Sequence, residues 1–441
     1  MAGDNRPLVL MLGSARYVPQ ACVRLGVDAV VVSGADERDE GGTPIPEGLT
    51  VLPVDDQTSP EAVLAALHRS GLADRTFDAV VTTDEFALVC AGLLAEHLGC
   101  RAIDPRTALR FRDKYLQKRV VAAAGVDTAR VTLIDDVHDT TGLTELPYRR
   151  AVLKPVAGAA TAFTGVVNGI DDLHAASRRY RAARTAARTF VLEEFVGGSE
   201  WIADGVVFGG EVLFWSLGTY GDPCLTAVER GLPLWLRRFD PDTESWQYEA
   251  AEPVVRRALD ALGLTDGVFH MELFHDPGTG RVVFSECAAR RGGALIHEET
   301  LAKFGVDLAE AMLLCALGTR PRINVKARPE TIGTAYFSGR PGTVLDVPTA
   351  EQLTALPGVE YARVDIRIGT TWDAGARSTD QRAAQVMVAA ASEADLLRRF
   401  TELRAWFDER LVVVDPRATG RELRDGQRVA PATGARVAPW N

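Results

Sequence analysis

Short apolar runs alternate with amphipathic stretches through the first hundred or so residues of the chain. The apolar runs predict buried strands at Pro7–Gly13, Ala29–Ser33 and Phe77–Thr83. Helical periodicity predicts helices at Glu61–Ser70 and Phe86–Leu98. Strands that alternate with helices are typical of βαβ units, so this region predicts a parallel sheet. The segment Gly34–Pro53, rich in Gly, Pro and acidic residues, predicts a surface loop.

The middle of the chain predicts a second arrangement, in which several strands pair as hairpins. A long helical pattern at Ala108–Ala124 ends at Gly125, a typical residue after a helix C-terminus. Strands are predicted at Ala151–Pro155, Thr164–Asn168, Thr189–Val196, Glu200–Val207, Glu211–Leu217, Gly267–Phe274 and Arg281–Glu286. Helices are predicted at Asp171–Ala187, Glu252–Leu262 and Glu298–Leu317. Tyr220–Thr243 has no clear period and predicts a long loop, which is usually functional inside a domain.

The chain changes character at Thr331, where short strands mix with helices. Strands are predicted at Thr331–Phe337, Val359–Ile368 and Ala383–Ala390, and helices at Ala350–Leu356 and Glu393–Leu411. These elements predict a further α+β unit, and the Arg-, Gly- and Pro-rich tail from Asp415 predicts a peripheral extension. The whole chain is therefore expected to combine α/β and α+β units.

Composition excludes several classes of protein. The 441 residues include 49 basic and 60 acidic side chains, for a net charge of −11, which argues against a nucleic-acid-binding protein. The chain has no stretch of about 18 apolar residues, so no membrane span is predicted. The N-terminus lacks the basic region of a signal peptide, and the six cysteines show no CxxC spacing. We therefore expect a cytoplasmic protein with reduced thiols and no zinc site.

Lysine is rare in this chain. There are 44 arginines and five lysines, which are Lys114, Lys118, Lys154, Lys303 and Lys326. A lysine that remains where arginine is otherwise preferred can mark a position that needs a compact ammonium group.

Two carboxylates are expected to face each other across a hairpin at residues 267–290. His270, Glu272 and Phe274 share one face of their strand, and Glu286 lies on the next strand. Counting from the turn places Glu272 and Glu286 opposite each other within one residue, where partners lie about 4.5–5.5 Å apart. Such a pair repels unless it binds a cation, such as Mg²⁺, or keeps a proton. Removal of either carboxylate is expected to relieve the repulsion, and the alternative is a solvated pair.

Two other segments have the composition of a nucleotide site. Lys154 precedes the small-residue loop Ala157–Thr164, whose backbone N–H groups could approach an anion, although a plain β-turn is equally consistent. The segment LEEFVGGSE ends one strand with Glu193 and Glu194 and begins the next with Glu200. Such a connection could be a hinge that holds a planar ligand, or its acidic residues could simply be solvated.

In this order the segments resemble the ATP-grasp superfamily. The matching motifs are FRDKY with Lys114, VLKP with Lys154, LEEFVGGSE, HMELF with Glu272, and SECAARRGG with Glu286 and Arg290. They cover about residues 80–320. The metal hairpin and the segment FSGRPGTVLDVPTAEQLTALPGVE are most similar to the L-amino-acid ligase type.

The resemblance implies a fold and a division of the chain. The fold would be an ATP-grasp fold with an N-terminal Rossmann-like parallel-sheet domain at residues 1–108. The small lobe, with the phosphate loop and the adenine hinge, would cover residues 109–195. The large lobe, with the metal hairpin and a specificity loop, would cover residues 196–320. A C-terminal α+β unit and tail would cover residues 321–441.

The resemblance also implies roles for particular residues. Lys114 and Lys154 would contact the phosphates of ATP, and the loop with Gly158 and Thr161 would cover them. The adenine contacts would come from Glu193, from Glu194 beside it and from the backbone near Val196, and Glu200 would accept from the ribose hydroxyls. Glu272 and Glu286 would hold Mg²⁺, and Arg290 would steady the transferred phosphoryl group. The family usually has Asn where this chain has Ala288, which removes one expected metal ligand.

The chemistry implied is the activation of a carboxylate by ATP and the attack of an amine on the acyl phosphate, with small molecules such as amino acids as substrates. A homodimer is also possible. The candidate substrate residues are His270, Gly293 and, in the predicted loop, Glu229, Arg230, Trp235 and Arg237. Ordinary structural roles for His270 and the loop residues stay open.

Three other functions remain open. The first is a carboxylase that acts on bicarbonate, although no biotinyl-acceptor domain is apparent. The second is an ATP-binding protein without turnover, which Ala288 would favour. The third is a dinucleotide-binding protein based on Leu12–Arg16, which lacks the GxGxxG pattern.

Overall fold

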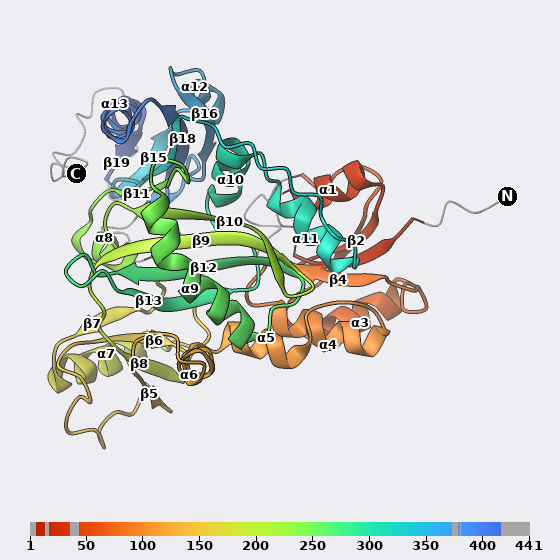
Figure 1. The fold of residues 1–441 in the computed structure, drawn as a ribbon, viewed down its shortest axis with the longest axis horizontal. Helices are drawn as coiled ribbons and strands as arrows, with labels where there is room; N and C mark the ends of the chain where they lie inside the picture. Colours follow the sequence, from red (N-terminus) through yellow and green to blue (C-terminus); the bar gives the residue numbers. More distant parts are fainter. Residues whose placement is uncertain (1–5, 14–16, 36–43, 373–377, 380, 416–441) are drawn as a thin grey trace.

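The computed structural model describes residues 6–13, 17–35, 44–372, 378–379 and 381–415. Their strands form four sheets. Figure 1 shows how the labelled helices and strands are arranged. Parts of three segments interpreted from the sequence lie outside the described residues, namely Leu12–Arg16, Gly34–Pro53 and the tail from Asp415. No helix among the described residues is long and apolar enough to cross a membrane.

The N-terminal sheet is parallel, as predicted. Its strands are β1 (Leu8–Leu12), β2 (Asp28–Ser33), β3 (Thr50–Pro53) and β4 (Ala79–Thr82), in the order β3-β2-β1-β4. The helices of this region are α1 (Val18–Leu25), α3 (Pro60–Arg69) and α4 (Leu88–Leu98). Every residue of β1 is buried, which explains why its sequence is a continuous apolar run rather than an alternating one. β3 corrects the prediction of a loop at Gly34–Pro53.

The long helix predicted at Ala108–Ala124 is two helices. α5 (Pro105–Arg112) ends at Asp113, whose backbone is extended, and α6 (Lys114–Ala123) begins at the next residue. The Asp113 side chain accepts a hydrogen bond from the backbone N–H of Leu116 and so caps α6. The break matters for the site because it places Lys114 in the first turn of α6.

A small antiparallel sheet follows. Its strands are β5 (Val131–Ile134), β6 (Ala151–Pro155), β7 (Gly165–Val167) and β8 (Phe190–Glu194), in the order β5-β8-β6-β7. Helix α7 (Ile170–Ala182) contributes Leu173, Ala176 and Tyr180 to the apolar core that it shares with this sheet. The sequence did not predict β5, and α7 ends earlier than predicted.

The largest sheet has eight strands in the order β13-β12-β9-β10-β11-β14-β18-β16. Its strands are β9 (Ser199–Phe208), β10 (Glu211–Tyr220), β11 (Leu234–Arg238), β12 (Gly267–His275), β13 (Val282–Ala288), β14 (Thr331–Phe337), β16 (Val359–Val364) and β18 (Ala384–Ala390). The predicted turn between β9 and β10 is present, with positive φ angles of 60° at Gly209 and 77° at Gly210. Alternate residues of each strand face opposite sides, so one face packs on helix α9 (Ser245–Leu262) while the other carries Glu200, Asp204 and Glu272.

Two predictions in this region were wrong. The segment Tyr220–Thr243 is not a long loop, because it contains helix α8 (Cys224–Arg230) and strand β11 in the middle of the large sheet. The helix predicted at Glu298–Leu317 is two helices, α10 (Ile296–Phe304) and α11 (Leu308–Ala316). Gly305, with a φ of 71°, separates them.

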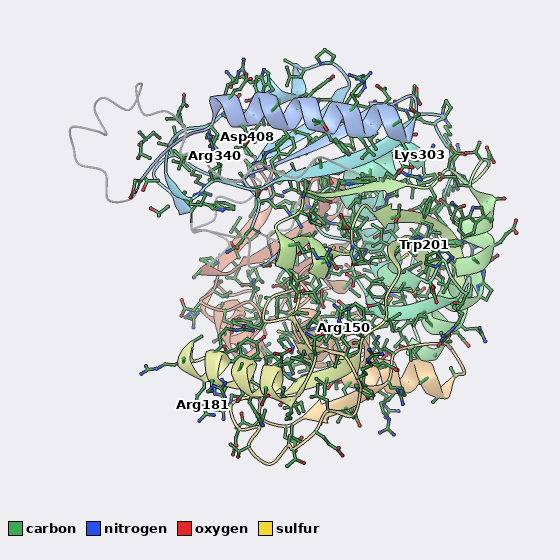
Figure 2. The ribbon with its side chains drawn as sticks, turned by 90° about the vertical axis from the view of Figure 1, so that its left-hand side faces the viewer. Arg150, Arg181, Trp201, Lys303, Arg340 and Asp408 are labelled. Carbon is green, nitrogen blue, oxygen red and sulfur yellow. The ribbon has the colours of Figure 1, made fainter. Side chains whose placement is uncertain are left out.

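The C-terminal strands extend the same large sheet across residue 321, through the pairing of β11 with β14. Helix α13 (Glu393–Arg410) packs on β14 and β18, and helix α12 (Ala350–Thr354) lies next to β16. A small sheet contains β17 (Thr371–Trp372), β15 (Gly342–Asp346) and β19 (Val412–Val414). Figure 2 shows α13, marked by Asp408, and α7, marked by Arg181, at opposite ends of the molecule. The four-part division of the chain remains a proposal.

Candidate active site

A cavity of about 300 Å³ lies between the small antiparallel sheet and the large sheet. All ten residues that the sequence suggested for the nucleotide and the metal line it. These are Lys114, Lys154, Gly158, Thr161, Glu193, Glu194, Val196, Glu200, Glu272 and Glu286. Segments that are more than 150 residues apart in the chain therefore meet at one place, between two sheets.

Glu272 and Glu286 are direct partners across the hairpin of β12 and β13, which confirms the predicted register. Beyond this pair Leu273 pairs with Phe284, so Ser285 is one extra residue in β13. Such a bulge changes the direction of neighbouring side chains. Both carboxylates are thereby presented to the same cavity.

Side-chain hydrogen bonds fix β13, which is the edge strand of the large sheet. The Gln117 side chain accepts a bond of 2.9 Å from the backbone N–H of Cys287 and donates one of 2.7 Å to the Cys287 carbonyl. The Thr128 hydroxyl donates to the Phe284 carbonyl at 2.9 Å. Helix α6 and the segment after it therefore replace a neighbouring strand and hold Glu286 in place.

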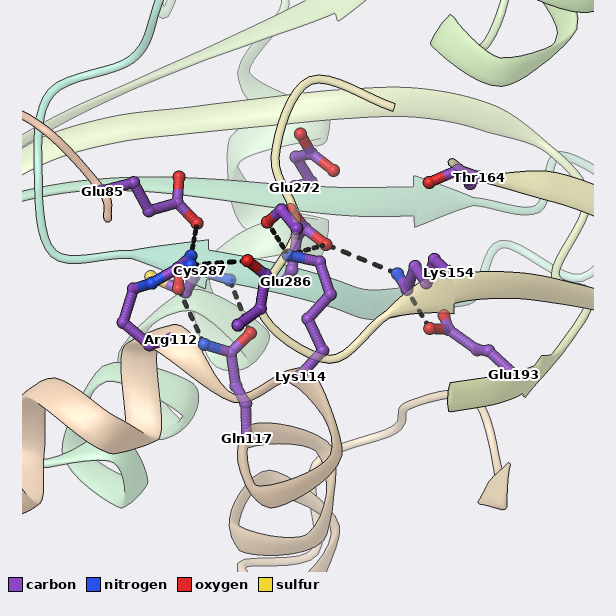
Figure 3. Close-up of polar contacts among 12 residues, drawn as sticks. Glu85, Arg112, Lys114, Gln117, Lys154, Thr164, Glu193, Glu272, Glu286 and Cys287 are labelled. Atoms are coloured by element: carbon purple, nitrogen blue, oxygen red, sulfur yellow. Dashed lines mark hydrogen bonds and ion pairs between the residues drawn. The ribbon is translucent and has the colours of Figure 1, made fainter. Parts of the chain in front are cut away.

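Three buried lysines surround the carboxylates, and Figure 3 shows two of them, Lys114 and Lys154. The Nζ atoms of Lys114 and Lys154 each lie 3.4 Å from Oε2 of Glu286. Lys154 Nζ also lies 2.9 Å from Oε2 of Glu193, whose Oε1 is 2.8 Å from Lys118 Nζ. The sequence motifs assigned no role to Lys118. Two signals could have found it, because lysines are rare in this chain and Lys118 lies one helical turn after Lys114.

The two facing carboxylates have opposite protonation behaviour. Burial, Glu286 and Glu200 together raise the pKa of Glu272 to about 8. Burial also disfavours the charge on Glu286, but Lys114, Lys154 and Lys118 outweigh it and hold the pKa at about 2. The repulsion is thus relieved by one proton on Glu272, while Glu286 stays ionised. The expectation that removing either carboxylate relieves repulsion is corrected, because Glu286 is also the partner of buried lysines.

The carboxylate of Glu193 pairs with two lysines, Lys118 and Lys154, and does not point freely into the cavity. Its pKa is lowered because Lys118 and Lys154 outweigh the effect of its burial. Glu194, beside it, forms a two-point pair with Arg130 at 2.8 and 2.9 Å. Val196, two residues further on, also lines the cavity.

Glu200 lies deeper in the cavity, at the start of β9. Its carboxylate accepts a hydrogen bond of 2.7 Å from the backbone N–H of Cys224 in α8. Burial raises its pKa to about 7. A carboxyl group in this position can accept hydrogen bonds from hydroxyl groups of a ligand.

The small-residue loop before β7 is held in an uncommon backbone conformation. Ala160, Thr161 and Phe163 all have positive φ angles, of 54°, 59° and 55°. The Lys114 ammonium donates a bond of 2.9 Å to the Gly158 carbonyl, and the Thr379 N–H donates one of 3.2 Å to Ala160. Positive φ outside glycine is rare and costs energy, and it concentrates at ligand-binding segments.

His270 belongs to a buried ionic network on the same sheet face. Its Nδ1 lies 2.8 Å from Asp204, which also accepts a bond of 2.9 Å from Arg238. Asp204 and Arg238 are fully buried, and Asp204 outweighs the effect of burial and raises the pKa of His270. The Nε2 atom lies 3.9 Å from Glu272, so the ring is anchored on one side and faces the site on the other.

Other expected substrate residues do not reach the cavity. Arg230 is exposed at the end of α8, and Gly293 is exposed before α10. Glu229 accepts a hydrogen bond from the Val166 N–H. Trp235 and Arg237 are buried in β11, where Trp235 contacts Phe400 and Arg237 pairs with Glu244. The segment Tyr220–Thr243 reaches the cavity through its first part instead, because Tyr220, Cys224 and Thr226 line it.

The donor set suits Mg²⁺ better than a metal that needs many protein ligands. No cluster of three or more His, Cys, Asp or Glu side chains that could hold a metal occurs among the described residues. Ala288, buried opposite His270, supplies no ligand. Mg²⁺ commonly binds one or two carboxylates and takes its other ligands from phosphate and water, which matches Glu272 and Glu286.

The chain is similar to several known proteins. Residues 20–100 match the ATP-grasp N-terminal domain, and residues 335–406 match L-amino acid ligase C-terminal domain 2. The chain is 24% identical over 310 residues to the L-arginine-specific L-amino acid ligase of Bacillus subtilis, covering 69% of this chain and 73% of that protein. It is 33% identical over 141 residues to human carnosine synthase 1, covering 31% of this chain and 16% of that protein.

A solved structure covers almost the whole chain. The L-amino acid ligase from Bacillus licheniformis has a TM-score of 0.78 at 20% identity, covering 93% of this chain and 99% of that one. The biotin carboxylase from Campylobacter jejuni has a TM-score of 0.62 at 14% identity, covering 92% of each chain. At these identities the likeness establishes the fold.

The proton on Glu272 gives a testable pH dependence. Between its ordinary pKa of 4.5 and about 8, the unfolded chain loses this proton while the folded protein keeps it. The metal-free protein therefore loses stability as the pH rises through this range. Since each unit of pKa shift corresponds to about 1.4 kcal/mol, Glu272→Gln should be more stable than the wild type by about 1 kcal/mol or more at pH 8.

Thermal melting in EDTA at pH 5 and pH 8 measures this difference, which should grow with pH. Glu286→Gln is the matched control with the opposite sign, because it removes the partner of buried lysines and should lower the melting temperature at pH 8. A Glu272→Gln variant that is less stable than the wild type at pH 8 would contradict the assignment of the proton.

Proposed function

We propose that this chain, which has the ATP-grasp fold and most resembles the L-amino acid ligases of that superfamily, joins a carboxylate to an amine at the expense of ATP. One observation carries the proposal. Two facing carboxylates and two buried lysines, Lys114 and Lys154, line a cavity between the two sheets, beside a small-residue loop. A third buried lysine, Lys118, pairs with Glu193 in the cavity wall. This set can bind a nucleotide triphosphate and a divalent cation together.

Lys114 and Lys154 are proposed to bind the phosphates. Both ammonium groups now face Glu286, and the arrival of phosphate oxygens would give them a stronger anionic partner. Lys118 would stay with Glu193, so that this buried carboxylate is not left without a charge partner. Gly158 and Thr161 would cover the phosphates, the segment from Glu194 to Val196 would contact the adenine, and Glu200 would accept from the ribose.

Glu272 and Glu286 are proposed to hold Mg²⁺, which neutralises phosphate charge and aligns the γ-phosphoryl group for transfer. For this role Glu272 must lose its proton, and the positive charge of the cation would then offset the negative charge of both carboxylates. Ala288 leaves the remaining coordination positions to phosphate oxygens and water.

The reaction consists of two transfers. The substrate carboxylate attacks the γ-phosphorus, which forms an acyl phosphate and releases ADP. The amine then attacks the acyl carbon, loses a proton and expels phosphate, so that an amide remains. Arg290 is proposed to steady the transferred phosphoryl group through its positive charge.

Amino acids are the proposed substrates. The relatives include an L-arginine-specific L-amino acid ligase and carnosine synthase 1, and the match to the L-amino acid ligase C-terminal domain adds to this. We place the reaction in the cytoplasm, where ATP is available and where the six free cysteines would stay reduced. A homodimer remains part of the proposal.

Lys154→Arg should weaken ATP binding, although arginine replaces lysine nearly everywhere else in this chain. A planar guanidinium cannot occupy the space of an ammonium group between Glu193 and Glu286. The affinity for Mg·ATP, measured by calorimetry, is expected to fall about tenfold or more. Lys326→Arg is the matched control, because Lys326 is exposed and should leave the affinity unchanged. Equal affinities in the two variants would remove Lys154 from the phosphate site.

ADP release in the presence of amino-acid pairs tests the proposed function directly. Stimulation by a pair, together with a new amide product, is the expected result. Bicarbonate serves as the second substrate class, since stimulation by bicarbonate alone would indicate a carboxylase. Glu286→Gln should release no ADP while remaining folded, because the cation loses one of its two carboxylates. No ADP with any substrate, despite bound ATP, would favour a protein without turnover.

A further inference from the structure

One buried carboxylate beside the cavity has no part in the proposed contacts with ATP or Mg²⁺. Glu85 follows β4, at the carboxyl edge of the parallel N-terminal sheet, and is 9% exposed. It lies between two arginines from different parts of the chain, Arg112 at the end of α5 and Arg290 after β13 (Figure 3 shows the pair with Arg112). Burial of a carboxylate is costly unless it is paired, and the two arginines supply that pairing.

The contact with Arg290 is made at two points. Oε2 of Glu85 accepts a hydrogen bond of 3.0 Å from Nε of Arg290 and a second from Nη2. The Nη1 group of Arg290 donates a bond of 2.8 Å to the carbonyl of Arg291. A guanidinium held along its Nε–Nη2 edge cannot rotate, so its remaining N–H groups have a fixed direction.

Arg290 also lies within electrostatic range of the metal pair. Burial disfavours its charge, but Glu85 outweighs this, and Glu286 and Glu272 add to the effect and raise its pKa further. With two arginines and one carboxylate, the group carries excess positive charge beside the place where phosphoryl transfer is proposed. The N-terminal segment thus supplies Glu85, the carboxylate that orients Arg290 at the end of the large sheet.

The other oxygen of Glu85 reaches the phosphate loop through Arg112. Oε1 accepts a bond of 2.8 Å from Nη1 of Arg112, whose Nη2 donates a bond of 2.6 Å to the carbonyl of Ala157. Ala157 is the first residue of the small-residue loop. One carboxylate therefore connects the N-terminal unit both to this loop and to Arg290.

We propose that Glu85 is a positioning residue, which holds the Arg290 guanidinium so that its free N–H groups face the phosphoryl group during transfer. The inference rests on the proposed function, because the role of Arg290 does. Glu85 itself touches neither substrate nor cation in this scheme.

A phosphoryl mimic tests this role without knowledge of the amino-acid substrates. The binding of Mg·ADP is measured alone and with aluminium fluoride, which stands for the transferred phosphoryl group. Aluminium fluoride should tighten binding to the wild type. In Glu85→Gln, the affinity for Mg·ADP alone should stay within about twofold of the wild-type value. The gain in affinity caused by aluminium fluoride should be about tenfold or more smaller than in the wild type.

A double-mutant cycle separates positioning from a general structural effect. If Glu85 acts through Arg290, Glu85→Gln should cause no further loss of tightening in an Arg290→Met background. Asp84→Asn is the matched control, because its carboxylate accepts bonds from Gln57 and from the N–H of Phe86 and has no contact with Arg290. Aluminium fluoride should tighten the binding of Mg·ADP to this variant as much as it does to the wild type.

A second variant covers the case in which Glu85→Gln fails to fold. Arg290→Lys keeps a positive charge near Glu85 but cannot form the two-point contact, and it should lose the same tightening. Full tightening in Arg290→Lys or Glu85→Gln, additive losses in the cycle, or no tightening in the wild type would overturn the inference alone. A wild type that does not bind Mg·ADP at all would overturn the proposed function.

Discussion

The repulsion between Glu272 and Glu286 is the constraint on which the rest of the site depends. Two carboxylates that are direct cross-strand partners cannot both be ionised in a buried place without compensation. The chain compensates with lysines on one side and a proton on the other. Lys114 and Lys154 stabilise the charge of Glu286, and Glu272 keeps its proton up to about pH 8. The lysines and one proton thus compensate the pair, and the proposed Mg²⁺ would replace that proton.

The three larger sheets contribute to this balance. The small sheet provides Lys154 and Glu193, and the large sheet provides the carboxylate pair. Helix α6 carries Lys114 and Lys118 and also fixes the edge strand through Gln117. The segment after the parallel sheet provides Glu85, which reaches both the phosphate loop and Arg290. A change in the relative position of these units would therefore alter the charges around the cavity.

The sequence predicted the parts of the site that depend on local pattern. The alternation of side chains along the strands, counted from the turn, predicted that Glu272 and Glu286 face each other. Lys114 and Lys154, singled out by their short motifs, line the same cavity. Four features were beyond local pattern. The break at Asp113 needed knowledge of a capping bond, and β11 looked like a loop because its arginines pair with distant acids, Arg237 with Glu393 and Arg238 with Asp204. Glu85 takes its meaning from Arg290, 205 residues away, and Lys118 from Glu193, 75 residues away, and no local pattern can reveal such partners.

The count of protons released when Mg·ATP binds tests the central claim most directly. Calorimetry at pH 7 in buffers with different ionisation enthalpies gives that number. If the cation replaces the proton on Glu272, the wild type should release about one proton more than Glu272→Gln, because the pKa of this carboxyl is about 8 before the cation binds. Equal proton release by the wild type and by Glu272→Gln would show that the carboxylate pair is not balanced in this way.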